Sequence, residues 1–180
     1  MIPSVPAATA LSKYSSMPGM FGGGRTYEAN SKAQDICYDV SETDDYDEKM
    51  RLCLKALKTF RFCTEAYSLI GLCFSEGPEH MRNPHIAVGM YRRGIHCAVT
   101  LNPEYPTKKL EWTMMECRPY IRAMHGLAIA LFKMGDVDGA IEEATRLIAN
   151  KPEGHSVSGS VYGWLLTAGR YDQADSYQSE

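Results

Sequence analysis

Cysteine and histidine are the residues of this chain whose side chains could bind a metal ion or act as nucleophiles. The 180-residue sequence contains six cysteines and five histidines. No two cysteines form a CxxC pair, and no cysteine stands at a zinc-finger distance from a histidine. His80 and His85 are the first and last residues of the turn sequence HMRNPH, which contains no third histidine and no cysteine or carboxylate as a further metal ligand. The spacing therefore predicts no metal site.

Four of the cysteines fall among apolar residues in segments that we expect to be helical: Cys37, Cys53, Cys73 and Cys97. We interpret the cysteines as small buried hydrophobic residues with reduced thiols, in preference to disulfides or metal ligands. Reduced thiols favour an intracellular location, with the cytoplasm as the first choice.

Motifs that bind phosphates or support hydrolysis are missing from the sequence. It contains no P-loop, no GxGxxG and no HExxH. The glycine run at 22–24 precedes Arg25 without a strand before it or a helical pattern after it, so it does not fit a phosphate-binding loop. We expect no catalytic residue, no cofactor and no metal, and a protein that is not an enzyme.

The composition is that of an ordinary globular protein, with 44% hydrophobic and 23% charged residues. The length fits one domain. A net charge of −3 disfavours a dedicated nucleic-acid-binding protein, which usually has a basic surplus. No apolar run is long enough to predict a membrane span.

Residues 1–29 differ from the rest of the chain. Segment 1–27 contains three prolines and four glycines, and its apolar residues follow no helical or strand period. We interpret 1–29 as a flexible N-terminal tail. The first acidic residue is Glu28. Organellar transit peptides also lack acidic residues, so an organellar destination stays open.

A helical hairpin is predicted between Met124 and Pro152. Gly135 separates two apolar stripes at helical spacing. The stripes are Met124, Leu127, Ala128 and Leu131, then Ala140, Ile141, Ala144, Leu147 and Ile148.

The hairpin pattern recurs with a period of 34 residues. Adding 34 places Gly135 on Gly169 and Ala140 on Ala174. The same shift converts Ala33, Ile36, Cys37 and Val40 into Tyr67, Ile70, Gly71 and Phe74. This period is that of the tetratricopeptide repeat, a helix–turn–helix unit. We therefore predict an all-α, tetratricopeptide-like superhelix of antiparallel helical hairpins, a right-handed α–α solenoid without a sheet.

We divide residues 30–180 into four units and one insertion: 30–63, 64–100, insertion 101–120, 121–154 and 155–180. Asn83 and Pro84 predict the start of a long helix that ends near Leu101. Lys108–Cys117 is expected to form a short helix. Insertions in solenoids often lie on the binding face, and the alternatives are a surface loop or a plug in the stack.

The last unit is incomplete. Its polar second helix would begin at Tyr171 and run out at Glu180. It is interpreted as a solubilising cap or as a unit that a partner completes.

Several stretches resemble a known family. Arg118–Ala123, followed by GLAIALFKMGDVDGAIEEATRLIANKP, resembles a family of tetratricopeptide-like proteins found in bacteria and some eukaryotes. The stretches AQDICYDV, KMRLCLKAL and CTEAYSLIGL are similar to its first half and, more faintly, to the suppressor of tumorigenicity proteins. The resemblance covers residues 33–177 and implies no established catalytic activity. The family's Asn-Asp-Asn-rich turn is replaced here by Pro152–Ser156.

Seven carboxylates crowd one short segment: Asp35, Asp39, Glu42, Asp44, Asp45, Asp47 and Glu48. They would stabilise the N-terminus of the following helix, or alternatively form an acidic patch for a basic partner. A basic stripe follows at Arg51, Lys55, Lys58 and Arg61. We expect this stripe to complement the carboxylates.

The resemblance to tetratricopeptide modules implies a groove lined by the first helix of each hairpin. The candidate protein-binding residues lie at the third unit: Arg118, Arg122, His125, Ile129, Phe132 and Lys133. Arginine and aromatic residues are common interface anchors. The alternative is that Arg122 pairs with Glu111 or Glu116 inside the protein. The Lys and Asn clamp of the chaperone-binding subtype is absent, because His125 and Ile129 occupy its positions.

These features predict a non-enzymatic interaction module or scaffold that binds a peptide or helix of a protein partner, without nucleic acid or a membrane span. The alternative is a structural subunit built permanently into a larger assembly, for instance in an organelle. The sequence leaves the partner and the oligomeric state open.

Overall fold

The predicted helical pairs are present in the computed structural model, which describes residues 24–150 and 158–177. Four antiparallel hairpins follow one another: α2 (Gly24–Ser41) with α3 (Tyr46–Thr59), α4 (Thr64–Glu76) with α5 (Pro84–Leu101), α6 (Arg118–Lys133) with α7 (Val137–Ala149), and α8 (Ser158–Thr167) with α9 (Tyr171–Ala174). Two short 3₁₀ turns, Met115–Cys117 and Asp175–Tyr177, are also present. Residues 24–150 and 158–177 contain no β-strand.

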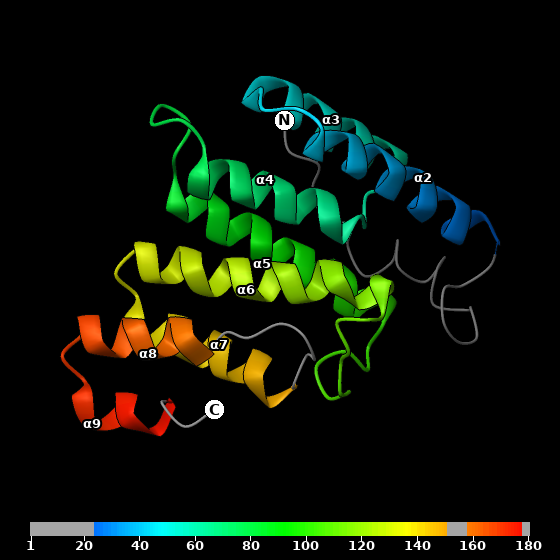
Figure 1. Cartoon of the computed structure of the whole chain (residues 1–180). Coiled ribbons are helices and arrows are strands. Elements are labelled where there is room, and N and C mark those ends of the chain that lie inside the picture. The colour runs from blue at the N-terminus through cyan, green and yellow to red at the C-terminus, as the bar shows by residue number, and fades with distance from the viewer. Residues whose placement is uncertain (1–23, 151–157, 178–180) are drawn as a thin grey trace.

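Each hairpin stacks on the next, because α3 contacts α4, α5 contacts α6 and α7 contacts α8. In Figure 1 the hairpins descend in chain order from α2 and α3 to α9. The predicted fold class, an all-α tetratricopeptide-like stack of hairpins, is confirmed.

Short polar side chains begin the second helix of three hairpins. Asp45 accepts a hydrogen bond from the Asp47 amide at 2.9 Å. Asn83 accepts one from the Ile86 amide at 3.2 Å, which confirms the predicted helix start. Such caps stabilise a helix by about 0.5–2 kcal/mol each. Asp136 caps α7 in the same way, through the amide of Gly139.

Glycine ends the first helix of the last two hairpins. Gly135 and Gly169 adopt φ values of +85° and +72°, which only glycine reaches without strain. The two residues are 34 apart, so the predicted helix stops repeat with the period of the fold.

The central hairpins pack around Tyr91 of α5. A Cβ atom on Gly71 of α4 would lie 2.9 Å from the Tyr91 ring, and one on Gly126 of α6 would overlap it. The two glycines therefore create the space in which the ring lies between α4 and α6.

The predicted helix over Lys108–Cys117 is wrong, since only Met115–Cys117 form a single 3₁₀ turn. Instead the insertion folds onto the third hairpin. Tyr105 and Leu110 are buried, Tyr105 packs against the Tyr120 ring at 5.2 Å between centroids, and the Leu110 amide donates to the Asn150 carbonyl. Of the three interpretations offered for the insertion, the structure supports the plug.

All six cysteines are buried, as predicted. Burial raises the pKa of the Cys53 and Cys97 thiols to about 12. The sulfurs of Cys37 and Cys63 lie 3.8 Å apart between α2 and the start of α4.

The predicted turn at Pro152–Ser156 lies wholly outside the described residues, and the tail and the chain end at Glu180 lie partly outside them. Helix α2 extends back to Gly24, before the boundary drawn at residue 30. The division into units stays a prediction.

Candidate functional site

The first helices of the hairpins form one face. α2 contacts α4, and α4 contacts α6. Equivalent residues of α2 and α4 are 34 apart, and those of α4 and α6 are 57 apart because the insertion lies between them. Burial follows this register: Cys37, Gly71 and Ala128 are equivalent, and all three are buried. The register identifies which side chains face the same way.

Arg122 pairs with Glu65, its equivalent on α4. Arg122 Nη2 and Nε donate to Glu65 Oε2 at 2.7 and 3.3 Å. The Glu65 residue is only 9% exposed, so its carboxylate needs a cation or hydrogen-bond donors beside it. The internal partner of Arg122 is thus neither Glu111 nor Glu116 but a residue of the preceding hairpin.

Lys133 repeats this arrangement at the opposite end of α6. Its ammonium pairs with Glu76 of α4 and donates to the Ser75 carbonyl at 3.4 Å. The two ion pairs connect both ends of two parallel helices, and therefore fix α6 against α4.

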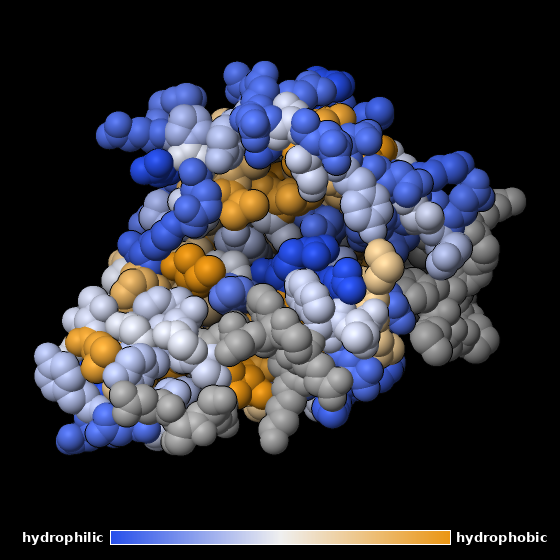
Figure 2. Space-filling model, in the orientation of Figure 1, coloured by the Kyte–Doolittle hydropathy of each residue, from blue (hydrophilic) through white to orange (hydrophobic). Residues whose placement is uncertain are grey.

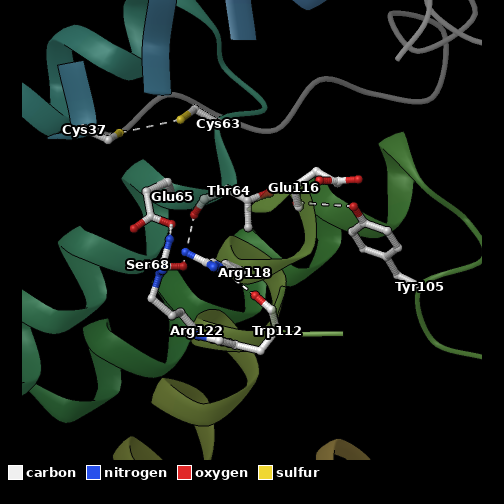
Figure 3. A network of polar contacts seen from close by, with 10 residues as sticks. All are labelled: Cys37, Cys63, Thr64, Glu65, Ser68, Tyr105, Trp112, Glu116, Arg118 and Arg122. Atoms are coloured by element: carbon white, nitrogen blue, oxygen red, sulfur yellow. Dashed lines mark hydrogen bonds and ion pairs between the residues drawn. The ribbon is translucent and has the colours of Figure 1, made fainter. Parts of the chain in front are cut away.

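Arg118 lies one turn before Arg122 but contacts a different segment. Its Nε donates to the Trp112 carbonyl at 2.7 Å, and its guanidinium lies 5.3 Å from the centre of the Trp112 ring. Figure 3 shows Arg118 directed at the insertion and Arg122 at Glu65. Arg118 thus connects the insertion to the start of α6.

The remaining candidates, His125, Ile129 and Phe132, are half-buried on α6. The Phe132 ring stacks on Trp164 of α8, with 5.2 Å between centroids and an 18° angle between planes. Phe132 therefore belongs in part to the core between the last two hairpins.

Sequence reasoning named Ile129 as a candidate but did not connect it with an apolar stripe on the same face, formed by Tyr38, Leu72 and Ile129. These residues occupy one register position on α2, α4 and α6. Tyr38 is 57% and Leu72 47% exposed, and Ile129 is half-buried. The repeat period could have revealed the stripe, had equivalent positions been compared for exposed apolar residues as well as for charge.

The acidic segment divides into two groups. Asp45 caps α3, and Glu48 pairs with Arg51, which holds the pKa of the Glu48 carboxyl below its usual value. These two residues fit the interpretation of charge at a helix N-terminus. Asp35 is exposed on α2 and Glu42 is exposed in the turn directly after it, and neither forms an ion pair within the described part of the chain.

Figure 2 views the molecule from the side of the first helices. Hydrophilic residues lie at the centre of this face, with hydrophobic groups beside them. The pattern suits a surface that combines apolar contact with charge.

Small cavities lie beside the insertion. One is lined by Asn102, Tyr105 and Glu116 and has a volume of about 30 Å³, which suffices for a water molecule but not for a substrate. Across residues 24–150 and 158–177, no three His, Cys, Asp or Glu side chains are grouped so that they could hold a metal ion.

The helical hairpins define a tetratricopeptide-like repeat protein. No family model matches the chain, and no curated protein matches it. Among solved structures, the chain is similar to one titled "Crystal structure of MamA protein", with 19% identity over 83% of this chain and 88% of that one, and a TM-score of 0.30. Likeness at this level supports no functional argument, and the resemblance to a particular family stays a prediction.

In the described part of the chain, no helix combines the length and the apolar character needed to cross a bilayer.

Proposed function

We propose that the chain is a non-enzymatic protein-interaction module, and that it binds a peptide or helix of its partner across α2, α4 and α6. The observation that supports this function is the apolar stripe of Tyr38, Leu72 and Ile129. An exposed tyrosine and an exposed leucine occupy the same register position on the first helices of successive hairpins and so form an array. Scattered apolar residues, by contrast, are normal on any surface.

The spacing of the stripe suits a peptide. Packed helices lie about 8–10 Å apart, and an extended chain covers that distance in about three residues. A segment crossing the face could place one apolar side chain on each of Tyr38, Leu72 and Ile129. Apolar contacts in the middle with charges around them are the usual arrangement of an interface.

The six predicted site residues have different roles in this proposal. His125 and Phe132 border Ile129 on α6. Arg122 and Lys133 align the two helices that present the stripe, and Arg118 secures the insertion at the edge. The binding surface therefore extends over three hairpins and is not centred on the third alone.

A capture experiment tests the proposed function. The immobilised protein is compared with Leu72→Ser and with Met115→Ser, which removes another exposed apolar side chain on the insertion. Burying a leucine side chain contributes about 1.5–3 kcal/mol. The Leu72→Ser variant should therefore bind its partner about tenfold more weakly, or worse, and capture less of it. Met115→Ser should retain them, and equal capture by both variants would remove the stripe from the function.

A second function, a permanent structural subunit, is favoured by the last hairpin. Tyr171 is 64% exposed and Leu166 is also exposed, which leaves apolar surface where a further repeat would stack. Size-exclusion chromatography with light scattering separates the two functions. A stable monomer supports the module, whereas insolubility or aggregation of the isolated chain supports the subunit.

A further inference from the structure

We infer that the partner segment is basic, with Lys or Arg residues beside its apolar ones. This inference rests on the proposed function and adds the chemistry of the partner. It depends on the charges around Tyr38 and on how the cations of the same face are already used.

Two carboxylates stand near Tyr38 toward the end of α2. Asp35 lies three residues before Tyr38, so the two side chains share one side of the helix. Glu42 follows four residues after Tyr38, in the turn directly beyond the last residue of α2. Each is exposed, and neither carboxylate forms an ion pair within the described residues. The nearest lysine on α2, Lys32, already pairs with Glu28 at 2.7 Å.

The end of α2 adds further negative potential. Asp44 is exposed in the turn that follows it and Asp47 at the start of α3, and the carbonyl groups of a helix C-terminus carry partial negative charge. A cation placed over the Tyr38 ring would meet an electron-rich face and two carboxylates. This combination suits the side chain of lysine or arginine.

Two cations that α6 presents on this face are already neutralised. Arg122 pairs with Glu65 and Lys133 with Glu76. An acidic partner would have to break these pairs, whereas a basic partner uses carboxylates that are free. Charge complementarity therefore favours a segment in which basic residues lie over α2 and apolar residues contact Leu72 and Ile129.

The test is selection of a random peptide library on the immobilised full-length chain. The affinity of an enriched peptide is then measured for three variants. Asp35→Asn/Glu42→Gln removes the charges beside Tyr38, Glu79→Gln/Asp172→Asn removes two exposed charges elsewhere, and Leu72→Ser shortens the stripe.

We expect enriched peptides to combine basic and apolar residues. Their affinity should fall about tenfold in Asp35→Asn/Glu42→Gln and in Leu72→Ser, but remain near wild type in Glu79→Gln/Asp172→Asn. Binding should also weaken with added salt.

Other outcomes overturn the inference in distinguishable ways. Neutral or acidic peptides that still depend on Leu72 would contradict a basic partner and leave the proposed function standing. If both charge variants weakened the binding of basic peptides equally, the peptides would be attracted by net charge alone, and the inference would be wrong. No enrichment, or binding that ignores Leu72, would overturn the inference and the proposed function together.

Discussion

The faces of α2 and α6 use equivalent positions of the repeat for opposite purposes. On α6 the charged residues Arg122 and Lys133 reach Glu65 and Glu76 of the neighbouring helix. Glu42, directly after α2, is the equivalent of Glu76, yet it forms no ion pair within the described residues. The difference arises because the next first helix presents Lys133 to Glu76, whereas α4 carries another carboxylate, Glu76, at the position equivalent to Glu42.

This comparison separates two uses of charge in a solenoid. Charges between hairpins set the spacing and register of the helices, and their removal affects stability. Exposed charges with no opposite charge on the neighbouring helix contribute little to stability and remain free for a partner. The residue type alone does not distinguish the two uses.

The largest effect is expected from Arg122→Glu, which places a carboxylate beside the buried Glu65. Loss of the cation that pairs with a buried carboxylate should destabilise the fold by about 2–3 kcal/mol. Urea denaturation measures this change. The paired exchange Glu65→Arg/Arg122→Glu should recover a large part of the loss. Equal instability of the single and exchanged variants would show that the pair does not fix α6 against α4.

A similar loss is expected from Gly126→Ala, because the new methyl group would overlap the buried Tyr91 ring. Overpacking costs typically about 1–3 kcal/mol. The matched control is Gly89→Ala on α5, where the added carbon would meet no atom within 4 Å apart from its chain neighbours and the backbone of its own helix. This variant should gain up to about 1 kcal/mol, since alanine favours helix. Thermal melting compares the pair, and similar melting temperatures would contradict the tight junction.

A smaller loss is expected from Ala140→Leu, because Ala140 is fully buried where α7 packs. We expect it to fall near the lower end of the 1–3 kcal/mol range for overpacking, about 1 kcal/mol. Glu142→Leu, on the exposed side of α7, removes a surface pair with Arg146 and should change stability by less than about 1 kcal/mol. Should the two variants unfold at the same urea concentration, the assigned helix register would be wrong.

High pH should weaken the core of the first hairpins gradually. The thiols of Cys53 and Cys97 have pKa values raised to about 12, whereas an unfolded thiol titrates near 8.5. The unfolded chain therefore loses these protons first. Stability is complete below about pH 8.5 and falls, by at most about 1.4 kcal/mol per pH unit for each thiol, as the pH approaches 12.

Urea midpoints measured at several alkaline pH values check this prediction. The Cys53→Ala/Cys97→Ala variant should show a flatter dependence on pH than wild type. An unchanged slope would assign the effect to buried tyrosines such as Tyr91, whose pKa is also raised by burial.

The repeat was predictable from sequence because it depends on local signals. The apolar period, Asn83 as a cap and Gly135 as a stop are each visible within one turn of helix. The insertion was not predictable, because its order comes from distant contacts such as the Leu110 amide with the Asn150 carbonyl. A short segment with few helical hydrogen bonds gives no periodic signal.

The ion-pair partner of Arg122 could not be predicted from sequence for a related reason. Its partner lies 57 residues away, and that separation combines one repeat with an insertion of irregular length. The candidates considered from sequence, Glu111 and Glu116, were near in the chain but not in the fold. The stripe, by contrast, was present in the 34-residue register and required only a comparison of exposed positions.

Site-specific photo-crosslinking tests the central claim, that the face of the first helices binds the partner, most directly. A benzophenone amino acid replaces Leu72 on α4 in one protein and the exposed Arg92 on α5 in another, and each is irradiated with a basic peptide enriched from the library. We predict a crosslink from position 72 that excess unlabelled peptide suppresses, and none from position 92. Crosslinking from position 92 alone, or equally from both positions, would contradict the binding face assigned to α2, α4 and α6.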